Sequence, residues 1–92
     1  MKIQVTQQDI DNGLKGLCTH CPVALAFKRV IQGGSVEVGD AAYIFPYNFD
    51  GPTVMITLPE FVHKFIRAFD SGNKVEPFEF ECEVDKRCEW IK

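Results

Sequence analysis

The segment VEPFEFECEVD, residues 75–85, alternates apolar and acidic side chains. Successive side chains of a β-strand point to opposite faces, so this period of two predicts a strand with one buried face and one solvated face. The apolar set is Phe78, Phe80, Cys82 and Val84, and the acidic set is Glu79, Glu81, Glu83 and Asp85. A fold for this chain therefore needs a sheet that is covered on one side only.

The rest of the chain predicts helices and further strands that can supply that cover. A capped helical segment is expected over TQQDIDNG, residues 6–13, followed by a loop over 14–21. The other predicted elements are strands at 2–5, 35–39, 41–47 and 53–58, a turn at 48–52, and helices at 22–32 and 59–70. This order predicts one α+β domain over residues 1–92, with an antiparallel sheet of four to five strands packed against two α-helices.

Net charge, hydropathy and cysteine content argue against several classes of function. The 92 residues carry a net charge of −3, which argues against binding DNA through bulk charge. Apolar runs are too short to span a bilayer, and the N-terminal residues lack the apolar region of a signal peptide. We therefore expect a cytoplasmic protein without a membrane or small-molecule partner, in which the four cysteines are thiols or metal ligands rather than disulfides.

The stretch CTHCP, residues 18–22, has the first-pair spacing of a zinc site and the C-x-x-C of a thiol redox centre. The second zinc pair would be Cys82 and Cys88, but their spacing is wider and Cys82 falls in the apolar register of its strand. The redox interpretation lacks the preceding strand that thioredoxin-like proteins have. We expect no cofactor and no enzymatic activity. The candidate metal ligands Cys18, His20 and Cys21 leave open an alternative, a small zinc- or thiol-containing binding module.

Two charged surfaces are candidates for recognition of a partner. Glu79, Glu81 and Glu83 share one face of the predicted last strand, and such a face is also typical of a solvated or protected sheet edge. Basic side chains lie off the apolar stripes of the two longer helices, where they would be solvated or would contact phosphate or an acidic protein surface. The predicted partner-binding residues are thus Lys28, Arg29, Lys64, Arg67, Glu79, Glu81 and Glu83.

Two motifs carry a resemblance to a known family. The first, CTHCPVALAFK, spans Cys18 to Lys28, and the second, FIRAFDSGNKVEPFEFE, spans Phe65 to Glu81. Together they resemble small phage-encoded proteins, and the chain is similar to anti-CRISPR proteins that act on the type I-F system. The resemblance implies a stoichiometric inhibitor in the bacterial host cytoplasm. Such an inhibitor would bind the crRNA-guided surveillance complex, through its Cas proteins or its crRNA, and prevent target DNA from hybridising to the guide.

Overall fold

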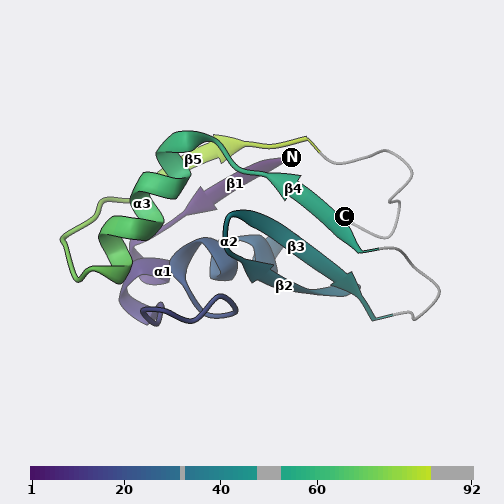
Figure 1. Cartoon of the computed structure of the whole chain (residues 1–92), viewed down its shortest axis with the longest axis horizontal. Coiled ribbons are helices and arrows are strands. Elements are labelled where there is room, and N and C mark those ends of the chain that lie inside the picture. The colour runs from purple at the N-terminus through teal and green to yellow at the C-terminus, as the bar shows by residue number, and fades with distance from the viewer. Residues whose placement is uncertain (32, 48–52, 84–92) are drawn as a thin grey trace.

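The computed structural model describes residues 1–31, 33–47 and 53–83, and its element order is β-α-α-β-β-β-α-β (Figure 1). The elements are β1 (Lys2–Val5), α1 (Gln7–Asn12), α2 (Pro22–Val30), β2 (Gly34–Val38), β3 (Ala41–Pro46), β4 (Val54–Thr57), α3 (Glu60–Asp70) and β5 (Phe78–Glu81). The predicted α+β class, antiparallel pairing and element order are confirmed. Among the described residues, no helix combines the length and apolar character needed to cross a membrane.

The five strands form two antiparallel sheets rather than one continuous sheet. Strands β2, β3 and β4 follow one another in a meander, whereas β1 pairs with β5. Past the end of β5, Met1 and Cys82 exchange two backbone hydrogen bonds, each 2.9 Å long. This long-range pairing holds the first strand against the last described segment of the chain. It leaves β4 and β5 as edge strands of different sheets.

Helix α1 begins and ends where the local sequence signals place it. The Thr6 hydroxyl accepts a hydrogen bond from the Asp9 amide at 3.2 Å, and the Asp9 carboxylate accepts one from the Thr6 amide at 2.9 Å. This reciprocal pair is a capping box, which satisfies donors that a helix start otherwise leaves unpaired. The helix ends at Gly13, as expected.

Helix α2 also begins as predicted but ends two residues early. Cys21 is its N-cap, and Pro22 occupies the first turn. The last helical residue is Val30, and the extended Ile31 follows, so the helix stops before the glycine pair that was expected to end it. Gly33 has a φ of 86°, which is a conformation that glycine adopts without strain.

Both longer helices pack on the same face of the β1–β5 sheet. Ile3 and Val5 are paired in register with Phe80 and Phe78, and these four side chains form the inward face. The ring of Phe27 on α2 lies 6.0 Å from that of Phe80, centroid to centroid. On α3, Phe61 and Phe65 contact the ring of Phe78, with centroids 5.9 and 4.7 Å apart.

The inward residues of β2, β3 and β4 belong to the same hydrophobic core. They are Val36, Val38, Ala42, Ile44, Val54 and Ile56. Helix α2 contacts both β1 and β2, so it packs against a strand of each sheet. The opposite face of both sheets carries no helix within the described part of the chain (Figure 1), and its exposed residues include Lys2, Met55 and Glu79.

Several predicted boundaries are wrong. The strand expected at 75–85 is confined to Phe78–Glu81, because residues 73–77 have no strand pairing and Cys82 follows the last paired residue. The acidic face is correct, since Glu79, Glu81 and Glu83 are exposed. The predicted turn at 48–52 and the residues from Val84 onward lie outside the described residues.

Candidate binding surface

Arg29 lies in an ion pair that the sequence did not indicate. Its guanidinium donates to both carboxylate oxygens of Asp9, with Nη2 lying 2.7 Å from Oδ2, and also donates to the Gln4 carbonyl. The Asp9 side chain is 5% exposed, whereas the Arg29 side chain is 46% exposed. The pair therefore joins α1 and α2 to the first strand, and Arg29 has a structural role whatever else it contacts.

The Asp9 carboxyl is held in its charged form. Burial acts to raise its pKa, but hydrogen bonds from Arg29 and from the Thr6 amide outweigh burial, so that the pKa lies below its ordinary value of 3.8. The same contact raises the pKa of the Arg29 guanidinium. Both groups therefore stay charged at neutral pH.

The other predicted bases are exposed and have different surroundings. Lys28 donates its ammonium to the Thr19 carbonyl, which adds a contact between α2 and the loop that precedes it. Arg67 pairs with Glu60 along α3 at 3.2 Å, with both side chains about two-thirds exposed. Lys64 is exposed on the same helix. An ion pair as exposed as Arg67–Glu60 contributes about 0–1 kcal/mol to the stability of the fold. Arg67 is therefore available to a partner at little cost to the fold, and Lys28 and Lys64 are exposed as well.

The acidic residues of the last strand divide into a paired and an unpaired set. Glu79 lies 3.4 Å from the Lys2 ammonium across the β1–β5 ladder. Within the described residues, no cationic side chain pairs with Glu81 or Glu83. Among the described residues, the acidic side chains of this strand that form no ion pair therefore lie at its Glu81 and Glu83 end.

The C-x-x-C stretch contributes the N-cap of α2. The Cys21 thiol is buried and accepts a hydrogen bond from the Ala24 amide at 3.5 Å, and burial raises its pKa. Cys18 and His20 are exposed, and His20 Nδ1 lies 2.8 Å from the Thr19 hydroxyl. Across the part of the chain that the structure describes, no three His, Cys, Asp or Glu side chains are arranged to hold a metal ion.

Cys82 is also buried, as its place in the apolar register predicted. Burial raises the pKa of its thiol. The nucleophile in cysteine chemistry is the thiolate, so burial of Cys21 and Cys82 disfavours the reactive form of both groups. Cys88, the remaining member of the zinc set considered above, lies outside the described residues.

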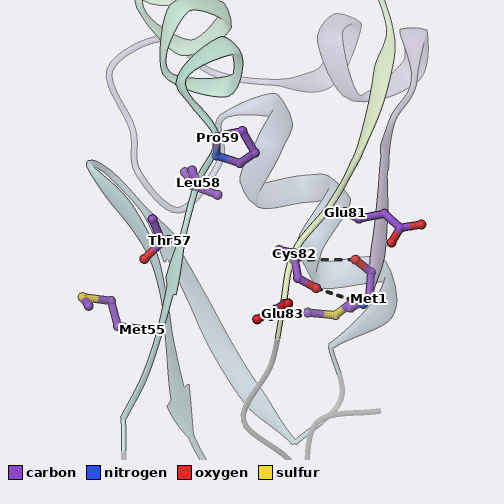
Figure 2. Close-up of a pocket in the computed structure, with 8 residues that line it drawn as sticks. All are labelled: Met1, Met55, Thr57, Leu58, Pro59, Glu81, Cys82 and Glu83. Carbon is purple, nitrogen blue, oxygen red and sulfur yellow. Dashed lines mark hydrogen bonds between the residues drawn. The ribbon is translucent and has the colours of Figure 1, made fainter.

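A groove between the two sheets is the feature that sequence reasoning missed. It has a volume of about 1050 Å³ and opens between β4 and the end of β5 (Figure 2). Its lining residues are Met1, Met55, Thr57, Leu58, Pro59, Glu81, Cys82 and Glu83. Two of the predicted binding residues, Glu81 and Glu83, are thus brought together with residues of β4 that the sequence did not single out.

The outward face of the meander continues the surface beside the groove. Met55 is 63% exposed, and its register partner Tyr43 is half-buried on the neighbouring strand. Phe45 follows on the same face of β3, and the exposed Tyr47 lies just beyond the strand. Exposed aromatic and methionine side chains are typical of protein-binding surfaces. The aromatic alternation of residues 41–47 was the sequence signal for this face.

Comparison of the chain with models of known families, with curated proteins and with solved structures returns no match.

Proposed function

We propose that this protein is a non-enzymatic inhibitor that binds the type I-F crRNA-guided surveillance complex and blocks hybridisation of target DNA. The resemblance of its two motifs to type I-F anti-CRISPR proteins supports the identity of the target. The proposed site of action is the cytoplasm of the bacterial host.

The arrangement of the motif residues bears on where a partner would bind. The two motifs meet in the core, where Phe27 of the first contacts Phe80 of the second. Side chains that pack against each other in the core are not available to a partner, whereas side chains on the outer surface are. We therefore assign recognition to the outer face of the sheets rather than to the motif cysteines.

The single observation that carries a binding role is the open outer surface. It combines the groove, the exposed Met55 and the acidic Glu81 and Glu83, and it is broad rather than enclosed. A patch with an apolar part and a charged rim matches the anatomy of protein interfaces, in which charge complementarity governs association rate and register. Burial raises the pKa of the Cys21 and Cys82 thiols, which disfavours thiol chemistry at these two positions.

Gel filtration of the purified surveillance complex with an excess of this protein tests the proposal. We expect co-elution, and we expect the complex so formed to have lost target-DNA binding. Reversing Glu81 and Glu83 to lysine tests the acidic end of the surface, and reversing Lys28 and Lys64 to glutamate tests the helices. Glu76→Lys, at an exposed position ahead of β5, controls for a change of charge alone. Absence of co-elution for the unmodified protein would refute the proposal.

A further inference from the structure

The groove lies between two sheet edges to which no further strand of the described residues is paired. The strand orders β2-β3-β4 and β1-β5 place β4 at one edge and β5 at another, and residues from both edges line the groove. Figure 2 shows Met55 and Thr57 of β4 on one side, with Glu81, Cys82 and Glu83 on the other. An edge strand presents backbone N–H and C=O groups that a further strand can pair with.

Strand β4 differs from the other edge strands in having no charge. Residues 53–58, TVMITL, contain no charged side chain, whereas β1 carries Lys2, β2 carries Glu37, and β5 carries Glu79 and Glu81. Proteins commonly protect edge strands with charged side chains, which hinder pairing with other chains. Strand β4 lacks that protection along about 13 Å of edge, the length of a four-residue strand.

The wall opposite β4 carries two acidic residues, Glu81 and Glu83, although the Glu81 carboxylate extends away from β4 (Figure 2). Glu81 and Glu83 are exposed and have no cationic partner among the described residues, in contrast to Glu79, which pairs with Lys2. The N-terminal ammonium of Met1 also lies in the groove lining, where it donates to the Cys82 carbonyl at 2.9 Å. Among the described residues that line the groove, two carboxylates and one ammonium give a net negative charge, which complements lysine or arginine.

We propose that this groove binds an extended segment of a partner protein that carries lysine or arginine side chains. The segment adds as a strand to the edge of β4 that has no partner among the described strands. Its basic side chains lie on the exposed face, where Glu81 and Glu83 are also exposed, and its alternate, apolar side chains lie on the opposite face, toward Leu58. Main-chain hydrogen bonds supply affinity in this mode of recognition, and alternate side chains supply specificity. The inference rests on the proposed function in one respect only, namely that the protein acts by binding another protein.

The test uses the full chain and a synthetic capped peptide of alternating lysine and valine, with amide chemical shifts as the readout. We expect saturable shifts at residues of β4 and at Glu81. Binding should weaken by about tenfold when both Glu81 and Glu83 are changed to glutamine, since both exposed charge contacts with the lysine side chains are then lost. A peptide with glutamate in place of lysine, and a lysine peptide with N-methylated backbone amides, should not bind.

Position 57 offers a matched pair of variants, because Thr57 is exposed and lines the groove. Thr57→Lys should weaken binding of the lysine peptide, and Thr57→Glu should preserve or strengthen it. Equal binding of the lysine and glutamate peptides, shifts confined to another surface, or self-association of the chain through β4 would each overturn the inference. If the peptide fails while the protein still co-elutes with the surveillance complex, only this inference is wrong. If co-elution itself fails, the proposed function is wrong.

Discussion

Replacing Arg29 with methionine tests the structural role of its ion pair with Asp9. The change removes the guanidinium but keeps an unbranched apolar stem, so the packing of α2 is largely retained. What remains is a carboxylate that is 95% covered and has lost its only cationic partner among the described residues. The Thr6 amide and hydroxyl would still contact Asp9.

The expected loss of unfolding free energy in Arg29→Met depends on how exposed Arg29 and Asp9 are. Removing one partner from a buried pair costs about 3–5 kcal/mol, whereas an exposed pair contributes about 0–1 kcal/mol. Arg29 is 46% exposed and Asp9 is 5% exposed, so the pair lies between these limits, and we expect a loss of about 2 kcal/mol. For a domain of this size, that loss lowers Tm by about 8–16 °C. Because small domains have about 5–15 kcal/mol of stability, the variant should still fold.

Urea unfolding followed by circular dichroism gives the free energy of unfolding for the variant and the unmodified protein. Lys28→Met is the matched control, since Lys28 is the neighbouring exposed base, and its effect should be below about 0.5 kcal/mol. If Arg29→Met costs no more than this control, the ion pair does not stabilise the fold and the argument for its structural role is refuted.

The pH dependence provides a second measure of the same pair. The pKa of Asp9 in the folded protein lies below its ordinary value of 3.8, so the pair contributes stability above that value. The contribution is lost as the pH falls through the lowered pKa of the folded state. The difference in unfolding free energy between the unmodified protein and Arg29→Met should therefore shrink below about pH 4. A difference that stays constant down to pH 2 would contradict the assignment.

Two further predictions concern packing and thiol exposure. A methyl group at Gly13 would lie 2.7 Å from ring carbons of Pro22, so Gly13→Ala should cost about 1–3 kcal/mol, whereas Gly39→Ala meets nothing within 4 Å and should be nearly neutral in thermal unfolding. Equal Tm values for these two variants would contradict the close contact. Alkylation of the native protein, followed site by site with mass spectrometry, should modify the exposed Cys18 faster than the buried Cys21 by about tenfold or more. If Cys21 and Cys18 of the native protein are alkylated at the same rate, and that rate equals the rate in denaturant, the fold does not protect Cys21 from alkylation.

The sequence predicted correctly those helix and strand features that depend only on neighbouring residues. The capping pair of Thr6 and Asp9, the stop at Gly13 and the start at Pro22 all depend on residues within one or two turns of each other. Alternation at Phe78 and Phe80 likewise predicted which side chains are buried or half-buried. These features did not require knowledge of where distant segments lie.

Features that depend on distant segments were not predicted. The pairing of β1 with β5 joins opposite ends of the chain, and the division of the strands into two sheets follows from it. Arg29 was interpreted as a free surface charge because its partner lies twenty residues earlier on a different helix. The groove was missed for the same reason, since Met55 and Glu81 meet across it only in the folded chain. The absence of charge in residues 53–58 was the one signal that could have indicated an unprotected edge.

The most direct test of the central claim is a titration of target-DNA binding by the type I-F surveillance complex. Labelled target DNA is added to the purified complex after incubation with increasing amounts of this protein, and bound DNA is measured by fluorescence anisotropy. We expect DNA binding to fall in proportion to the protein added and to be abolished near a fixed stoichiometric ratio. Unchanged DNA binding at saturating excess, with a protein shown to be folded, would contradict the claim.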